Sequence, residues 1–121
     1  MNIHESAEDY LEAILMLKKE KGFARSVDIA TRLNVTKPSV SFAMKRLREN
    51  DYIMMDEESL ITLTAKGEEI ALRMYELHTT LASFLMRLGV PEKIALEDAC
   101  KIEHDISAET FAAIKRQLEQ A

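Results

Sequence analysis

The sequence predicts a mainly α-helical protein in which a winged helix-turn-helix unit precedes a second helical unit. Three observations support this fold class. Residues that favour helices dominate the 121-residue chain, which has only 3 glycines and 2 prolines. Apolar residues recur at helical spacing in most of the chain. Two short apolar runs around a polar turn follow the third helical segment, and this order of elements is typical of a winged helix.

The first three helices can be delimited from the residue types at their ends. Ser6 is expected to cap the first helix, and Gly22 ends it after a lysine-rich last turn. Ser26 is the expected cap of the second helix. Thr36 caps the third, and Pro38 lies in its first turn, where the missing N–H costs nothing.

The rest of the chain is expected to form a hairpin and three further helices. Residues 52–55 and 60–63 are the predicted strands. Thr64 caps a long helix with a continuous apolar stripe. A fifth helix follows over residues 92–105, and Ser107 caps the sixth.

Charge is distributed unevenly and indicates two domains. The whole chain has a formal net charge of −5, but residues 23–50 carry six basic and two acidic side chains. A basic patch attracts phosphates locally, because the screening length is roughly 8 Å in physiological salt. We place a winged helix-turn-helix DNA-binding domain at residues 1–64. A helical metal-binding and dimerisation domain is expected at residues 65–121.

The composition favours a soluble cytoplasmic protein. The single cysteine, Cys100, cannot supply the paired cysteines typical of small secreted domains. Residues 1–10 are polar and acidic and lack the apolar run of a signal peptide. No stretch is apolar enough to span a bilayer.

The third helix is the candidate recognition helix. The N-terminal part of such a helix enters the major groove, where small and polar groups fit. Basic side chains, hydroxyls and helix N–H groups bind the phosphates. We expect Ser39, Ser41 and Phe42 to approach base edges. The predicted DNA-contacting residues are Arg25, Thr36, Lys37, Pro38, Ser39, Ser41, Phe42, Lys45 and Arg46.

Two other interpretations of this segment stay open. A charged helix face is usually only solvated, and winged helices also serve as protein-interaction modules. The predicted wing tip is acidic, with Asp56, Glu57 and Glu58, and it would repel phosphate if it lay in the minor groove.

Six potential metal ligands lie on three of the predicted helices. Asp9 and Glu12 share a face of the first helix, whereas Cys100, Glu103 and His104 share a face of the fifth. His78 flanks the apolar stripe of the long helix. Carboxylates, imidazoles and a thiol suit a divalent transition metal better than calcium or magnesium. Each residue alone also has an ordinary structural explanation, as a cap partner, a surface acid or a buried side chain.

These residues carry a resemblance to a known family. The chain resembles the diphtheria toxin repressor family of metal-dependent regulators, in particular its shorter manganese-transport-regulator branch. The match runs in order through nearly the whole chain. The matching segments are residues 8–12, 27–47, 63–67, 78, 84–89 and 100–104.

The resemblance implies a homodimeric repressor that binds palindromic operator DNA when it carries Mn(II) or Fe(II), with one or two ions per subunit. It also implies regulation of metal-uptake genes. The family's ligands fall on Asp9, Glu12, His78, Glu103 and His104. The remaining ligand is a glutamate in the manganese branch and a cysteine in the iron branch, and here it is Cys100. The family's ancillary metal site is not expected, because Ala82 and Leu96 replace its ligands.

Three other functions would leave different experimental signatures. A winged-helix regulator that senses a non-metal effector would bind DNA equally well in chelator. A metalloenzyme is not expected, because no separate base or oxyanion motif accompanies the His, Cys and acidic residues. A protein-interaction module would show no salt-dependent affinity for DNA.

Overall fold

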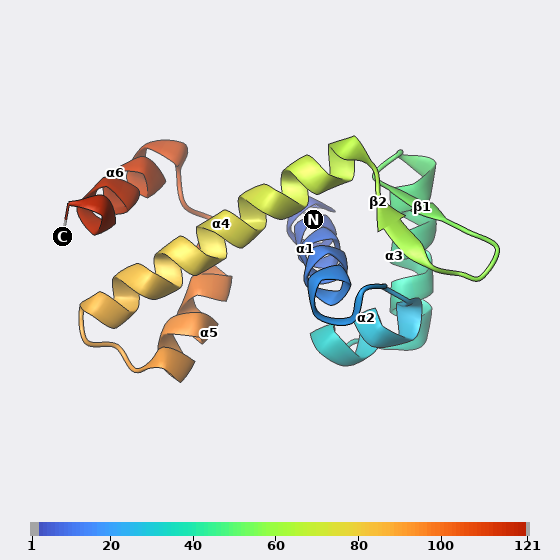
Figure 1. Ribbon diagram of the computed structural model, residues 1–121, viewed down its shortest axis with the longest axis horizontal. Helices are drawn as coiled ribbons and strands as arrows, with labels where there is room; N and C mark the ends of the chain where they lie inside the picture. Colours follow the sequence, from blue (N-terminus) through green and yellow to red (C-terminus); the bar gives the residue numbers. More distant parts are fainter. Residues whose placement is uncertain (1–2, 121) are drawn as a thin grey trace. The chain divides into compact units, whose positions relative to one another are not determined.

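The computed structural model describes the backbone of residues 3–120 and the side chains of residues 7–120. The described chain contains six helices and one two-stranded sheet, which confirms the predicted fold class (Figure 1). It forms two compact units, Met1–Arg73 and Met74–Ala121. The division falls within a helix that begins directly after Thr64, the residue at which the sequence-based boundary was placed. No described helix is both long and apolar enough to cross a membrane.

The first unit is a three-helix bundle with a hairpin and the start of a fourth helix. Its elements are α1 (Ile3–Lys21), α2 (Ser26–Leu33), α3 (Lys37–Glu49), β1 (Ile53–Met55), β2 (Ile61–Leu63) and the first turns of α4 (Ala65–Arg87). Each contributes apolar side chains to one core. The largest fully buried side chains of this core are Leu11, Ile14, Ile29, Val40, Met44, Ile53 and Ile61.

The cap of α3 is confirmed, whereas the predicted cap of α2 is wrong. The Thr36 hydroxyl accepts a hydrogen bond from the Ser39 amide at 3.2 Å. In contrast, Ser26 is the first helical residue of α2, and the extended residue before it is Arg25, which makes no side-chain capping bond. The carbonyl of Arg25 instead accepts the first helical bonds, from the amides of Asp28 and Ile29. α1 begins at Ile3, so Ser6 lies inside it, and the side chain of Ser6 is outside the described part.

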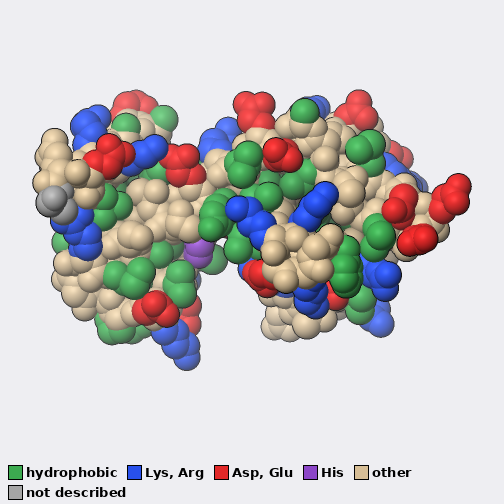
Figure 2. All heavy atoms as spheres, viewed as in Figure 1, with side chains coloured by type: hydrophobic (Ala, Val, Ile, Leu, Met, Phe, Trp, Pro, Cys, Tyr) green, Lys and Arg blue, Asp and Glu red, His purple; other side chains and the backbone are tan. Residues whose placement is uncertain are grey.

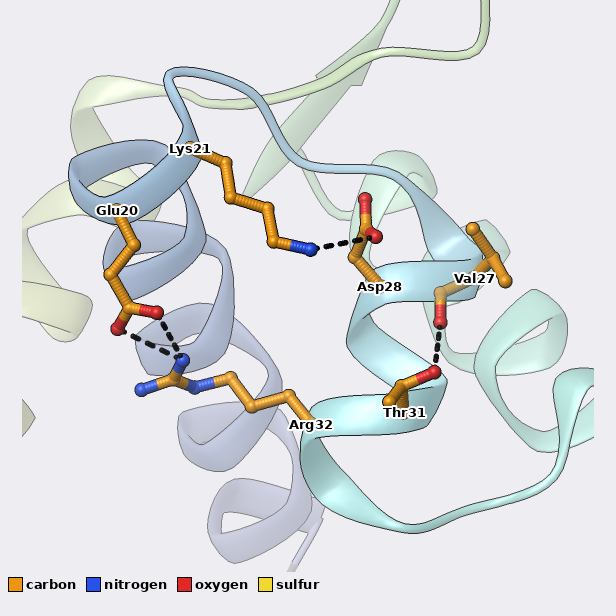
Figure 3. Close-up of polar contacts among 6 residues, drawn as sticks. All are labelled: Glu20, Lys21, Val27, Asp28, Thr31 and Arg32. Carbon is orange, nitrogen blue, oxygen red and sulfur yellow. Dashed lines mark hydrogen bonds and ion pairs between the residues drawn. The ribbon is translucent and has the colours of Figure 1, made fainter.

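Side-chain hydrogen bonds and ion pairs connect α1 with α2 (Figure 3). Arg32 donates to both carboxylate oxygens of Glu20, at 3.0 and 3.1 Å. Lys21 forms an ion pair of 3.3 Å with Asp28. These contacts lie at the surface, so each contributes little to stability.

The hairpin is shorter than predicted by one residue in each strand. Ile53 pairs with Leu63, and Met55 pairs with Ile61, in an antiparallel register. The Asp56 carboxylate accepts from two amides of the loop, at 2.9 Å each, and so closes the turn. Figure 2 shows acidic side chains at the tip of this hairpin, as the sequence predicted.

The junction of the hairpin with α4 depends on a close approach of two backbone segments. The Thr64 hydroxyl accepts from the Gly67 amide at 3.2 Å, which confirms Thr64 as the cap of α4. A Cβ atom at Gly67 would overlap the carbonyl oxygen of Tyr52. Gly67 is therefore required by space and not by its backbone angle.

The second unit packs the end of α4 against α5 (Glu92–Ile102) and α6 (Ala108–Glu119). Ser107 caps α6 through the Thr110 amide at 3.1 Å, as predicted. The fifth helix ends at Ile102, three residues before the predicted end at residue 105. The small core of this unit consists of Leu81, Ala82 and Ala99, with Ile106 and Ile114 packed against it.

Candidate metal centre and nucleic-acid interface

Three predicted metal ligands meet within the second unit. His78 comes from the middle of α4, Cys100 from the last turn of α5, and Glu103 from the residue that ends α5. The Nδ1 atom of His78 lies 3.1 Å from a carboxylate oxygen of Glu103 and 3.7 Å from the Sγ atom of Cys100. The nitrogen, sulfur and oxygen donors all lie within 4.8 Å of one another.

Glu103 is unusual because it is a buried charge. Among the residues whose side chains the structure describes, it is the one charged residue that is buried, with 3% exposure. Burial of a carboxylate costs several kcal/mol (order of magnitude) unless a cation or hydrogen bonds compensate. His78 supplies the cation, because Cys100 and then Glu103 raise the pKa of its imidazole to about 10. A protonated His78 would place positive charge beside Glu103, which is also what a bound metal ion would do.

His104 adjoins the same carboxylate from its other side. Its Nε2 atom lies 3.6 Å from the second oxygen of Glu103, and its side chain is 5% exposed. The sequence placed Cys100, Glu103 and His104 on one helical face, but only Cys100 lies within α5. Glu103 keeps helical backbone angles, and its amide bonds to the carbonyl of Ala99, so the carboxylate still points toward His78.

The donor set fits a transition-metal ion. Ligand bonds of roughly 2.0–2.3 Å place neighbouring donors about 3–4 Å apart, which is the spacing of His78 from both Glu103 and Cys100. An imidazole, a thiol and a carboxylate together favour a borderline ion such as iron or zinc, and also accept manganese. Cys100 is exposed, so the group is accessible from solvent.

The remaining two predicted ligands lie on the first unit. Asp9 and Glu12 are one turn apart on α1, as the sequence indicated. Each is partly buried and already has an interaction partner. Their assignment as metal ligands stays a prediction.

The nine predicted DNA-contacting residues are all exposed. α3 buries Val40, Met44 and Leu47 against the core and leaves its opposite side to solvent. Phe42 is 63% exposed, an unusual position for an aromatic ring without a partner molecule. The Thr36 hydroxyl is occupied in capping, where it also donates to the Ser39 hydroxyl at 2.8 Å.

A basic hollow lies on one flank of α3. Its volume is about 450 Å³, and its basic lining residues are Arg25, Lys45 and Arg48. Ser26, Ser41 and Ser59 add hydroxyl groups to the same hollow. The sequence interpretation missed Arg48 as a site residue, although its spacing of three from Lys45 put both on one helix face.

This combination defines a class of protein. A winged helix presents an exposed basic recognition helix, and a second helical unit gathers metal donors around a buried carboxylate. Such a molecule is a metal-dependent DNA-binding regulator.

Comparison with protein-family models identifies the family within this class. Residues 2–59 match the model described as "Iron dependent repressor, N-terminal DNA binding domain". Residues 64–121 match "Iron dependent repressor, metal binding and dimerisation domain". The chain therefore belongs to the iron dependent repressor family, and the resemblance seen in the sequence is confirmed.

Curated relatives agree with this assignment. The chain is 41% identical over 111 residues to the transcriptional regulator MntR of Escherichia coli O6:H1, covering 92% of this chain and 72% of the relative. It is 39% identical over 102 residues to the HTH-type transcriptional regulator MntR of Bacillus subtilis, covering 84% and 72%. These relatives are named transcriptional regulators, so this is not an enzyme family, and the metalloenzyme alternative is set aside.

Solved structures share the fold. The chain superposes on the T. acidophilum IdeR with a TM-score of 0.84 and 31% identity, covering 93% of this chain and 53% of that one. It superposes on the manganese regulator SloR with a TM-score of 0.83 and 28% identity, covering 95% and 54%. The chain thus spans about half the length of each of these two solved structures.

Proposed function

We propose that the protein is a cytoplasmic, metal-activated repressor that binds palindromic operator DNA as a homodimer and regulates metal-uptake genes. The observation that carries this proposal is the buried Glu103 carboxylate, which contacts the His78 imidazole, which in turn contacts the Cys100 thiol. A buried carboxylate with an imidazole and a thiol nearby contributes nothing evident to the packing of the core. It is explained if a divalent cation is its usual partner.

The metal ligands proposed are Asp9, Glu12, His78, Cys100, Glu103 and His104, and the ion is Mn(II) or Fe(II). A bound ion supplies positive charge and fixed coordination geometry. His78 would bind the ion as the neutral imidazole, and the ion would supply the positive charge beside Glu103. Cys100 and Glu103 hold the C-terminal end of α5 against α4.

In a dimer, the distance between the two DNA-binding domains can control whether the protein binds DNA. The two DNA-binding domains of a dimer must be about 34 Å apart to contact successive major grooves on one side of the duplex. Metal favours the DNA-competent arrangement by shifting a pre-existing equilibrium. In each DNA-binding domain, we propose that Ser39, Ser41 and Phe42 face the bases. The basic hollow with Arg25, Lys45 and Arg48 takes a backbone phosphate.

Duplex binding measured with and without chelator tests the proposal. Fluorescence anisotropy with a labelled palindromic operator duplex should show tight binding in Mn(II) or Fe(II) and weak binding in EDTA. Glu103→Gln should weaken metal-dependent binding, whereas Glu97→Gln, which changes an exposed acid on α5, should not. Equal affinity in metal and in EDTA would contradict the proposal.

A further inference from the structure

The other flank of α3 borders a second, larger groove. It lies within the first unit, between α1, α3 and the start of α4, and its volume is about 820 Å³. Small-molecule sites typically have volumes of roughly 300–1,000 Å³. Its walls are mainly apolar. The apolar and aromatic side chains that line it include Tyr10, Leu11, Phe42, Leu47, Tyr52 and Ile70.

Two arginines border this apolar groove, and they differ in whether they form an ion pair. Arg73 forms an ion pair of 3.2 Å with Glu8, so the two charges offset each other. The guanidinium of Arg46 lies 5.7 Å from the centre of the Phe42 ring and has no ion-pair partner among the described residues. Among the lining residues of the groove, Arg46 is therefore the cation whose charge no ion pair offsets.

We propose that this groove binds a small amphipathic organic anion with an apolar body and one carboxylate. A carboxylate can take two parallel hydrogen bonds from the planar guanidinium of Arg46. An aromatic or aliphatic body then covers the apolar surface at Phe42, Tyr52 and Ile70. A DNA phosphate would meet Arg46 but would leave this apolar surface wet, so the groove fits an amphipathic ligand better than the duplex.

Occupation of the groove has a consequence for DNA recognition. Arg46 and Phe42 line the groove and are also predicted DNA contacts on α3. A ligand that holds the Arg46 guanidinium competes with a phosphate for the same donors. The ligand therefore lowers DNA affinity, and this consequence, unlike the binding itself, rests on the proposed DNA-binding function.

The test uses 2-naphthoate as the probe and neutral 2-naphthamide as its matched analogue. Calorimetric titration of the metal-free protein without DNA should show saturable binding of one naphthoate per chain. Arg46→Gln should weaken naphthoate binding by about tenfold, the usual effect of losing a charged hydrogen-bond donor, and should leave naphthamide unchanged. Lys18→Gln, which removes an exposed cation of α1 outside the groove, is the matched control.

A second variant fills the groove without a change of charge. Ala43→Phe should abolish binding of both probes while circular dichroism shows an unchanged helical content. The proposal is overturned if naphthoate shows no saturable binding, or if Arg46→Gln binds it as tightly as Lys18→Gln. Because these titrations contain neither metal nor DNA, they succeed or fail independently of the repressor function.

Discussion

At the residue scale, Cys100 is the position where this chain departs from the manganese branch it resembles. Its sulfur lies 3.7 Å from His78, so the structure places it among the donors and not in the core. A thiolate strengthens the binding of softer ions more than that of manganese, which stands lowest in the divalent affinity order. We therefore expect a site that accepts manganese but discriminates weakly against iron and cobalt.

Cobalt(II) titration measures this preference directly. Wild-type protein should show the near-ultraviolet charge-transfer band of a cobalt–thiolate bond, and Cys100→Ser should lack it. Cys100→Glu should move the ratio of manganese to cobalt affinity back toward manganese by about tenfold or more. Cobalt bound to the wild type without the band would show that the thiolate is not a ligand.

The raised pKa of His78 predicts how the metal-free protein responds to pH. Its imidazole titrates near 6.5 in an unfolded chain and at about 10 in the folded one. The stabilisation is therefore fully present below pH 6.5 and is lost as the pH rises through about 10. NMR titration of the metal-free protein should find His78 still cationic well above pH 6.5, and Glu103→Gln should lower its midpoint. A wild-type midpoint near 6.5 would contradict this electrostatic account of the site.

At the scale of elements, residue types predicted the helix starts well when the cap was a threonine or serine in a short turn. Thr36, Thr64 and Ser107 all cap the helices assigned to them. The failure at Ser26 has a physical reason, because a serine can also occupy the first helical turn. The backbone angles of the preceding Arg25 decide between the two positions, and a single sequence does not reveal them.

The sequence pattern also failed to predict the residue at which α5 ends. Helical spacing continues through His104, but the amide of Asp105 bonds to the carbonyl of Ile102 and tightens the chain into a turn. The sequence could gather Cys100, Glu103 and His78 from their types and spacing. It could not give the burial of Glu103, because burial depends on how α4 and α5 pack.

Gly67 offers a test of the junction between hairpin and helix. Within a helix, Gly→Ala usually stabilises by up to about 1 kcal/mol. Here the added Cβ would overlap the Tyr52 carbonyl, so we expect Gly67→Ala to destabilise the first unit by about 1–3 kcal/mol. Urea unfolding should show this loss, whereas Glu68→Ala at the exposed neighbouring position should change stability by less than about 0.5 kcal/mol. A stabilised Gly67→Ala variant would contradict the close approach.

At the scale of the whole molecule, an acidic protein is expected to bind a polyanion through one basic surface. The proposed surface is the basic hollow and the flank of α3, and the acidic residues 56–58 of the wing are not among the residues that line the hollow. Metal-loaded protein should lose DNA affinity with salt at a log–log slope of about −0.9 per phosphate contacted. Lys45→Ala and Arg48→Ala should each flatten the slope by about one contact. Lys93→Ala on α5 is the control, and an equal flattening by it would contradict the assignment of the hollow.

Dimerisation through the second unit is the last requirement of the proposed function. Ile114 of α6 packs against the core of its own unit and is not free for a dimer contact. The exposed large apolar side chains of this unit are Met86, Leu88, Ile94, Leu96 and Ile102.

Ile94 provides the sharpest test of this surface. It is 47% exposed on α5, and a two-fold symmetric contact would bury it twice. Each buried isoleucine contributes roughly 1.5–3 kcal/mol, so Ile94→Glu should weaken self-association by at least about a hundredfold. Sedimentation velocity of the metal-loaded protein at micromolar concentration measures the change. Met54→Glu places the same charge on an apolar residue of β1 that is 56% exposed, and it should leave the dimer intact. A monomeric wild type, or equal losses in the two variants, would refute dimerisation through this face.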